Sequence, residues 1–273
     1  MRTRTRLLAA LAGVALAFTA IVAHAQALEE GRLLLATQVL NDIRDSRDQG
    51  IPDRLLERAY GIAVIPDFTK VAFFLGGARG HGVLVVRNAN GQFSSPVFVT
   101  LTGGSFGFQW GVQKDDLVLV FTSRKGVEGI TGGKLTLGAD VSVAAGPVGR
   151  QASAATDQAF NAGVYSYSHT RGIFAGIALS GAALTIDDSA NAGFYGHPGL
   201  LASDIIAGTV HTNDFAAQRF LTAVSQGTGL QPASSMASSA AAPAVPAPAA
   251  ARPNGPAAQT FPLQDSNPGG NPN

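Results

Sequence analysis

One serine stands in a spacing that could support nucleophilic catalysis. Residues 103–107 read Gly-Gly-Ser-Phe-Gly and match the G-x-S-x-G pattern of hydrolases letter by letter. In those enzymes the serine occupies a sharp turn between a strand and a helix. Here residues 106–112 alternate apolar side chains with glycine or glutamine, which predicts a strand instead of a helix. A serine hydrolase using Ser105 is therefore the least favoured hypothesis, and the sequence predicts that the chain is not an enzyme.

Other patterns that could carry chemistry fail on spacing. Residues 129–134 are similar to a phosphate-binding loop. That pattern needs glycine at position 128 and serine or threonine at position 135, whereas this chain has Glu128 and Leu135. The adjacent carboxylates Asp115-Asp116 and Asp187-Asp188 point to opposite faces of an extended chain, so they cannot form a catalytic pair there. The histidines show no metal-ligand spacing. We therefore expect no cofactor and no metal.

Basic residues in glycine-rich or apolar surroundings are better candidates for a binding function. Solvated surface charge is one explanation for them. The other is a cationic rim around an apolar surface, which suits an anionic amphiphile because the cations contact its head group. We predict a lipid head-group site formed by Lys70, Arg79, Lys125, Lys134, Arg150 and Arg171, with apolar contacts from Phe106 and Trp110.

The N-terminal residues have the layout of a secretory signal peptide. Arg2, Arg4 and Arg6 precede an uncharged apolar run, Leu7 to Val22, and Ala23-His24-Ala25 supplies a small-x-small cleavage pattern. The apolar run is shorter than the ~20 residues that a spanning helix needs. An uncleaved membrane anchor is the alternative. We predict cleavage near Ala25 and export to the periplasm or the medium.

Removal of residues 1–25 changes the charge. The full chain has 19 basic and 18 acidic residues. Three of the basic residues precede position 25, so 16 basic residues remain against 18 acidic ones, a formal net charge of −2. This balance argues against a nucleic-acid partner, which would require a strong basic excess. The chain has no cysteine, which excludes disulfides and thiolate metal sites.

The periodicity of apolar residues indicates helices at both ends and strands between them. A helix is predicted over 28–48, and a short second helix contains Leu55 and Leu56. Strands are predicted at 62–65, 71–75, 83–87, 96–101, 106–112, 117–122, 135–143, 163–169 and 173–179. The strand at 62–65 is expected to end at Pro66, and Asn90-Gly91 is expected to form a hairpin turn. Later helices are predicted at 123–130, 189–194, 200–207 and 212–224.

Glycine and proline divide the chain into regions. Most of the 33 glycines lie between Gly61 and Gly199, which indicates tight turns and closely packed strands. Residues 232–273 hold nine of the 14 prolines and read as disordered. We predict one α+β domain over 26–230, followed by a Pro/Ala-rich tail over 231–273. The glycine-rich, mainly antiparallel sheet of the domain would form a barrel or sandwich, with N-terminal and C-terminal helices packed outside.

An ordered series of motifs resembles the SYLF domain family. The series begins at Gly61-Ile62-Ala63-Val64-Ile65-Pro66-Asp67 and includes Gly103-Gly104. Its other members are Lys70, Phe73-Phe74, Gly76-Gly77, Gly80, Gly82-Val83-Leu84-Val85, Pro96, Phe108-Gln109-Trp110-Gly111, Leu117-Val118, Gly132-Gly133-Lys134, Leu137-Gly138-Ala139-Asp140, Ala144-Ala145-Gly146-Pro147-Val148-Gly149-Arg150, Tyr165-Ser166, Gly172-Ile173-Phe174-Ala175-Gly176, Asn191 and Phe194-Tyr195-Gly196.

This resemblance covers roughly Leu28 to Val224 and implies a non-enzymatic lipid-binding module. Eukaryotic SYLF domains are associated with phosphoinositide-containing membranes, and some with actin, whereas bacterial members are usually exported. In eukaryotic members a basic N-terminal helix contributes to membrane contact. The corresponding stretch here is rich in acids: Glu29, Glu30, Asp42, Asp45 and Asp48. The resemblance implies a lipid or membrane surface as the partner, and the alternative is a structural or protein-interaction module with an envelope protein as its partner.

Overall fold

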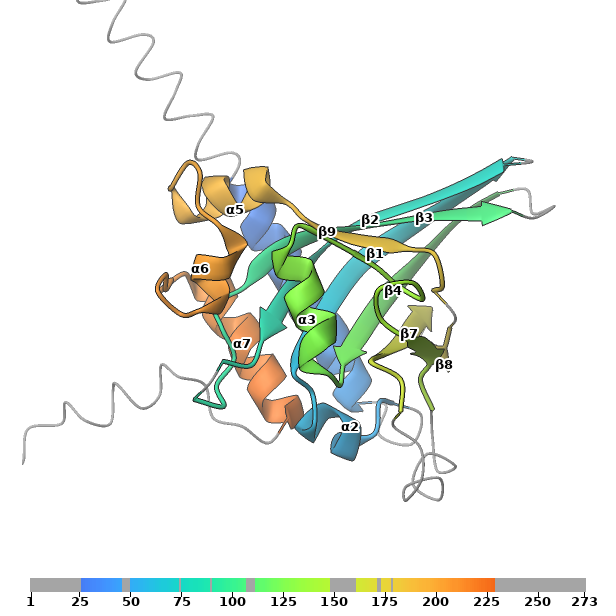
Figure 1. The fold of residues 1–273 in the computed structure, drawn as a ribbon, viewed down its shortest axis with the longest axis horizontal. Helices are drawn as coiled ribbons and strands as arrows, with labels where there is room; N and C mark the ends of the chain where they lie inside the picture. The colour runs from blue at the N-terminus through green and yellow to red at the C-terminus, as the bar shows by residue number, and fades with distance from the viewer. Residues whose placement is uncertain are drawn as a thin grey trace, which may run out of the picture.

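A computed structural model describes residues 26–45, 50–73, 75–88, 90–106, 111–147, 161–170, 173–177 and 179–228. The predicted signal peptide, 1–25, and the predicted tail, 231–273, lie outside these ranges. Within them the strands form one nine-stranded sheet with the order β5-β9-β3-β2-β1-β4-β7-β6, and β8 pairs with β7. The sheet curls into a half-barrel with helices packed against it (Figure 1). The predicted α+β fold class is therefore confirmed.

Long strands occupy the centre of the sheet and short ones its margins. All pairs are antiparallel except β6 with β7. The strands are β1 (Gly61–Phe73), β2 (Leu75–Val86), β3 (Val97–Phe106), β4 (Gly111–Phe121), β5 (Lys134–Thr136), β6 (Val143–Ala145), β7 (Val164–Thr170), β8 (Ile173–Gly176) and β9 (Ala183–Ile186).

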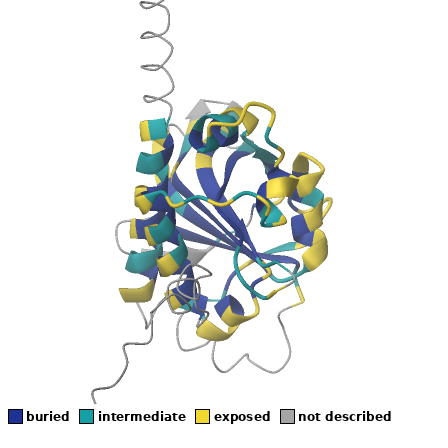
Figure 2. Cartoon of the chain, turned by 90° about the vertical axis from the view of Figure 1, so that its left-hand side faces the viewer, coloured by how far each residue is buried: buried dark blue, intermediate teal, exposed yellow. Residues whose placement is uncertain are grey.

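Helices cover both faces of the sheet. The first runs over 26–45, and the others are α2 (Asp53–Glu57), α3 (Arg124–Thr131), α5 (Asp188–Tyr195), α6 (Ala202–Ile206) and α7 (Phe215–Thr228). Side chains from helix 26–45, α2, α5 and α7 pack on one face, and side chains from α3 and α6 pack on the other. We call these the α7 face and the α3 face. Figure 2 shows the buried strands between the two groups of helices.

Alternation along the strands supplies both cores. Val83 and Val85 of β2 belong to the cluster on the α7 face, whereas Leu84 and Val86 belong to the cluster on the α3 face. Successive side chains of a strand point to opposite faces, so a strand covered on both sides reads as a continuous apolar run. The predicted buried strand at 117–122 is confirmed as the inner part of β4, in which residues 117–121 are buried.

The strand predicted to end at Pro66 does not end there. β1 continues to Phe73 through a bulge between Ile65 and Phe68, where Asp67 has a φ of 51°. The Asp67 N–H donates to Asp116 Oδ1 at 2.9 Å. A bulge is one of the few places where a strand tolerates proline, because the ladder is interrupted there. The expected end at Pro66 was therefore wrong for this physical reason.

The strand predicted at 71–75 is divided, because it contains the end of β1 and the start of β2, and two longer predicted strands are divided in the same way. Residues 106–112 contain the end of β3 and the start of β4, which are not neighbours in the sheet. Residues 135–143 contain parts of β5 and β6, separated by a turn in which Gly138 has a φ of 87°. Strand β9 had no counterpart among the predicted strands. Alternating polarity does not reveal a turn that interrupts it, so both boundaries were missed.

The four central strands extend beyond their outer neighbours. Strand β9 pairs with β3 only from Val99 to Thr102, and β7 pairs with β4 only from Asp116 to Phe121. Outwards from Thr102 on β3 and from Lys114 on β4, the strands β3, β2, β1 and β4 continue as a four-stranded extension in the described chain (Figure 1). We call this extension the β-arm: residues 69–73, 75–79, 102–106 and 111–114.

Candidate functional site

The register of the β-arm brings small and apolar residues into one row on the α7 face. Val112, Val71, Gly77 and Gly104 are successive Cα partners across β4, β1, β2 and β3. Direct partners in antiparallel strands place their side chains on the same face. Val71 is 37% exposed and Val112 is 64% exposed. No heavy atom lies within 4 Å of a Cβ built on Gly77 or Gly104. We call these four residues the apolar row.

A cationic row lies next to the apolar row on the same face. It consists of Lys114, Thr69, Arg79 and Thr102, again successive partners across the four strands. Lys114 and Arg79 are exposed, and the two threonines are half-buried. The threonine hydroxyls donate to backbone carbonyl oxygens, Thr69 to that of Asp67 at 3.0 Å and Thr102 to that of Ala183 at 3.4 Å.

The two cations of this row are weakly engaged by protein carboxylates. Lys114 Nζ lies 3.6 Å from Asp67 Oδ1, and both side chains are more than 60% exposed. An exposed pair of this kind contributes little, because water and salt screen it. Arg79 forms no ion pair with any residue in the part of the chain that the structure describes. Both charges therefore remain available to an external anion.

Polarity changes in order from the β-arm towards the body of the domain. The row after the cationic one contains His81 and Thr100, which are Cα partners, and Asp116 on β4. The next row contains Val64, Val83 and Val118, all buried beneath the helices of the α7 face. The α7 face therefore runs from an open apolar row, through cations, to mixed polar groups and then to the core.

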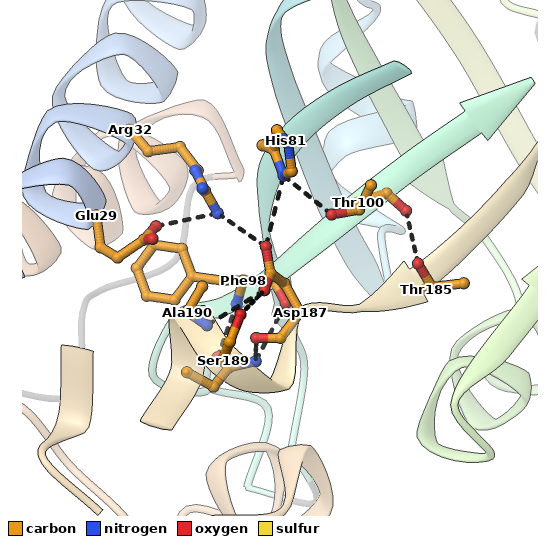
Figure 3. Close-up of polar contacts among 10 residues, drawn as sticks. Glu29, Arg32, His81, Phe98, Thr100, Thr185, Asp187, Ser189 and Ala190 are labelled. Carbon is orange, nitrogen blue, oxygen red and sulfur yellow. Dashed lines mark hydrogen bonds and ion pairs between the residues drawn. The ribbon is translucent and has the colours of Figure 1, made fainter. Parts of the chain in front are cut away.

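A polar cluster joins helix 26–45 to the sheet beside these rows (Figure 3). The Arg32 guanidinium lies 3.0 Å from Glu29 Oε2 and 3.6 Å from Asp187 Oδ2. His81 Nδ1 lies 3.5 Å from the same Asp187 oxygen and 3.0 Å from Thr100 Oγ1. Asp187 also accepts from the Ala190 N–H at 3.2 Å and so caps α5.

Burial and neighbouring charges shift the acid–base behaviour of this cluster. Burial raises the pKa of Glu29, although the positive charge of Arg32 opposes the shift. Burial and the charge of Arg32 lower the pKa of His81. Burial alone would raise the pKa of Asp187, but hydrogen bonds from Ser189 and Ala190, with the charge of Arg32, lower it overall. An ionised Asp187 beside a neutral His81 suits a structural link between elements.

The predicted head-group residues are not all brought together. Lys70 lies on the α3 face of the β-arm as the Cα partner of Ala78 and Gln113, and its Nζ lies 3.0 Å from Asp115 Oδ2. Arg79 lies on the α7 face in the cationic row. Lys125 is exposed on α3, against the opposite face of the sheet. The arrangement thus separates Lys70 and Lys125 from Arg79.

The remaining predicted residues lie at margins or outside the described ranges. Lys134 is exposed at the start of β5 as the Cα partner of Thr185, which in turn partners Thr100, so it occupies the far end of the row of His81. Phe106 ends β3 as the Cα partner of Leu75. Trp110, Arg150 and Arg171 lie outside the described residues.

Sequence reasoning misses Lys114, Val71 and Val112. The signal that identifies them is pairing: Lys114 partners Thr69, and Val112 partners Val71. Their separation in sequence hides this relationship, because only the long-range register of β1 and β4 places them side by side. They are found only when the pairing of the two strands and the exposure of the paired residues are known.

Ser105 does not stand at a nucleophile elbow. It lies within β3 as the Cα partner of Gly76, and β3 continues to Phe106. In the described ranges, no group of three or more histidine, aspartate or glutamate side chains could hold a metal ion. Likewise, none of the helices in those ranges has the length and apolar character needed to cross a membrane.

Comparison with known proteins identifies relatives of this domain. Residues 102–226, from β3 to α7, match the family described as "Ysc84: Las17-binding protein actin regulator". Protein YSC84 of Saccharomyces cerevisiae is 38% identical over 152 residues, which cover 55% of this chain and 32% of the yeast protein. The SH3 domain-containing YSC84-like protein 1 of Xenopus laevis is 33% identical over 168 residues, covering 61% of this chain and 50% of the frog protein.

A human relative gives a similar result. The SH3 domain-containing YSC84-like protein 1 of Homo sapiens is 33% identical over 153 residues, covering 56% of this chain and 44% of the human protein. The chain thus spans at most about half the length of these relatives. The family description denotes a binding protein and actin regulator, and none of the names of these relatives denotes an enzyme. These matches support the predicted resemblance of the domain to the SYLF domain family.

Proposed function

We propose that this chain is a non-enzymatic module of the bacterial envelope, exported after cleavage near Ala25, that binds the surface of an anionic lipid membrane. The observation that carries the proposal is the order of residues on the β-arm. An exposed apolar row, containing Val71 and Val112, adjoins an exposed cationic row, containing Arg79 and Lys114.

This order matches the profile of a membrane interface. Apolar side chains gain free energy on leaving water, at about 25 cal/mol per Å² of apolar area. A cation near an anionic lipid surface contributes about 1 kcal/mol. On a surface whose apolar residues lie nearer the outer end than its cations, one orientation lets the apolar residues leave water while the cations stay near the anionic head groups. The remaining net charge of −2 means that such binding would depend on this local arrangement, because the overall charge is unfavourable.

Further apolar residues follow those of the apolar row along the chain. The register positions that follow the apolar row hold Phe73, Leu75 and Phe106, which are successive Cα partners across β1, β2 and β3. The adjoining sequence also contains Phe74, Phe108 and Trp110. Aromatic residues are enriched where proteins meet the membrane–water interface.

Co-sedimentation with vesicles tests the proposal. The chain from Gln26 to Asn273 is mixed with phosphatidylcholine vesicles, or with vesicles that also contain phosphatidylglycerol, at low and high salt. We expect binding to the anionic vesicles that weakens with salt. The emission of Trp110, the one tryptophan of the chain, provides a second readout. Absence of binding to every vesicle would contradict the proposal.

A matched pair of variants assigns the contact to the β-arm. The double variant Val71→Ser/Val112→Ser should bind anionic vesicles about tenfold more weakly, because it removes part of the apolar burial. The control is Leu201→Ser/Phe215→Ser, which alters two exposed apolar residues of the helical body. An equal loss in both double variants would show that general surface hydrophobicity, and not the apolar row, drives binding.

A second candidate function is protein interaction through the strand edge. The N–H of Phe98 donates to Asn191 Oδ1 and its C=O accepts from Asn191 Nδ2, so this residue directs its backbone groups to the β9 side of β3. Alternation directs Gly104 to the same side, beyond the last residue that β9 pairs. An extended partner could add a strand there. Recovery of one stoichiometric envelope protein, together with no vesicle binding, would favour this function.

A further inference from the structure

We infer that the cationic row is a binding site for the phosphate of an anionic phospholipid, held between Arg79 and Lys114 above Thr69. The inference rests on the proposed lipid-binding function and assigns its head-group contact to two residues. Sequence alone does not identify Lys114 as a candidate. The strand register identifies it as the second cation, because it pairs with Thr69.

The geometry of the sheet lets both cations reach one phosphate. Strand β1 lies between β4 and β2, so Lys114 and Arg79 flank Thr69 in the same row. Adjacent strands are ~4.8 Å apart, which places the two cationic backbones ~10 Å from each other. Both side chains are long and on the same face. Thr69 is half-buried and its side chain is shorter than those of the two cations that flank it.

The two cations of the row are less engaged by carboxylates than the cation on the other face of the β-arm. On the α7 face, Arg79 has no ion-pair partner in the described ranges, and Lys114 has only the exposed Asp67 at 3.6 Å. On the α3 face, the ammonium of Lys70 lies 3.0 Å from Asp115, whose side chain is only 2% exposed. A buried carboxylate already neutralises that cation. The phosphate is therefore expected on the α7 face of the β-arm.

The spacing between the two rows fits the depth of a lipid interface. They are two residues apart along each strand, a separation of ~7 Å. Interfacial protein segments bury their apolar face about 5–10 Å into the boundary between head groups and acyl chains. With Arg79 and Lys114 at the level of the phosphates, Val71 and Val112 would reach this boundary. The β-arm would therefore enter the membrane with its outer end first.

A charge-neutralising double variant tests the site. Arg79→Gln/Lys114→Gln should bind vesicles of phosphatidylcholine and phosphatidylglycerol about thirtyfold more weakly than the parent chain, since each cation near an anionic surface contributes a factor of about five. The control, Arg124→Gln/Lys125→Gln, removes the same two charges from exposed positions on α3. The control should lose much less binding. Urea unfolding of both variants checks that the fold is retained.

Each outcome distinguishes the inference from the proposed function. If Arg79→Gln/Lys114→Gln binds as the parent does while Val71→Ser/Val112→Ser fails to bind, the phosphate site is wrong and the lipid-binding function stands. Equal losses in the two charge variants would replace the site with a general charge effect. Displacement from vesicles by inorganic phosphate, but not by chloride of equal ionic strength, would make free phosphate the ligand. If the parent chain binds no vesicle, the proposed function itself fails.

Discussion

The Arg32 guanidinium lies 3.6 Å from the Asp187 carboxylate and thereby links helix 26–45 to the start of α5. The same carboxylate caps α5 through the Ala190 N–H and lies 3.5 Å from His81 on β2. Three elements distant in sequence therefore depend on one acidic side chain. Because His81 belongs to β2, this carboxylate positions helix 26–45 and α5 against one of the strands that carry both rows.

Replacement of this carboxylate should destabilise the domain. We expect Asp187→Ala to lower the free energy of unfolding by about 2 kcal/mol, since it removes an N-cap and leaves Arg32 without one of its partners. Asp188→Ala is the control, because Asp188 is the exposed neighbouring residue in the first turn of the same helix. Its loss should cost about 0.5 kcal/mol. Urea denaturation measures both, and equal effects would contradict the linking role of Asp187.

The same cluster predicts a pH dependence of stability. The pKa of His81 is lowered in the folded protein, so the unfolded chain takes up its proton first as the pH falls. Stability contributed by neutral His81 is therefore present above the ordinary histidine pKa of about 6.5 and is lost as the pH falls from there through the folded pKa. Asp187, whose folded pKa is also lowered, adds a loss below the ordinary aspartate range, whereas Glu29, whose pKa is raised, partly offsets it.

His81→Gln should remove the histidine part of this dependence. The difference in free energy of unfolding between about pH 7.5 and about pH 5.5 should be smaller in this variant than in the parent chain. His211→Gln is the matched control, since His211 is exposed on the helical body. Urea unfolding at the two pH values provides the measurement. A variant that retains the full dependence would assign it to other groups.

Local periodicity predicted the helices and the buried strand well, because the apolar pattern of each lies within a short stretch of sequence. The helix expected over 28–48 is observed over 26–45, and Leu33, Ala36 and Val39 form its buried stripe. The continuous apolar character of residues 117–122 was enough to predict a buried strand there. The length of β1 was not predictable in this way, because the bulge at Asp67 is stabilised by Asp116 on another strand.

The candidate site was predictable only in part, for the same physical reason. Arg79 was identified from its glycine-rich surroundings, but its relation to Lys114 passes through Thr69 and requires two strand registers. Glycine-rich strands specify register weakly at the sequence level, because few side chains distinguish one pairing from its neighbours. Local sequence therefore indicated the chemistry of the site without its location.

Glycine is required where the bulge of β1 approaches β2. A Cβ built on Gly82 would lie 2.3 Å from the Val64 carbonyl oxygen and 2.9 Å from Ile65 Cα. We expect Gly82→Ala to lower the free energy of unfolding by about 3 kcal/mol, because the clash involves backbone atoms that cannot move aside locally. Gly77→Ala should be neutral or slightly stabilising, since its Cβ would meet no atom within 4 Å. Thermal or urea unfolding compares the two, and a tolerated alanine at position 82 would contradict the close approach.

Two lysines of the β-arm should give opposite results when their charge is removed. Lys70 lies 3.0 Å from the buried carboxylate of Asp115, whereas Lys114 lies 3.6 Å from the exposed Asp67. Lys70→Met should lower the free energy of unfolding by about 2 kcal/mol, since it removes the cation that offsets a buried charge. Lys114→Met should change it by no more than about 0.5 kcal/mol, as expected for an exposed pair.

Vesicle binding should reverse this order. Lys114→Met should weaken binding to phosphatidylglycerol-containing vesicles about fivefold, because it removes one cation of the proposed phosphate site. Lys70→Met should bind like the parent chain under conditions in which both are folded, since its ammonium faces Asp115 on the α3 face. Urea unfolding and co-sedimentation on the same two proteins provide the comparison. If Lys70→Met weakens vesicle binding as much as Lys114→Met does, both faces of the β-arm contact lipid and the orientation derived from the cationic row is wrong.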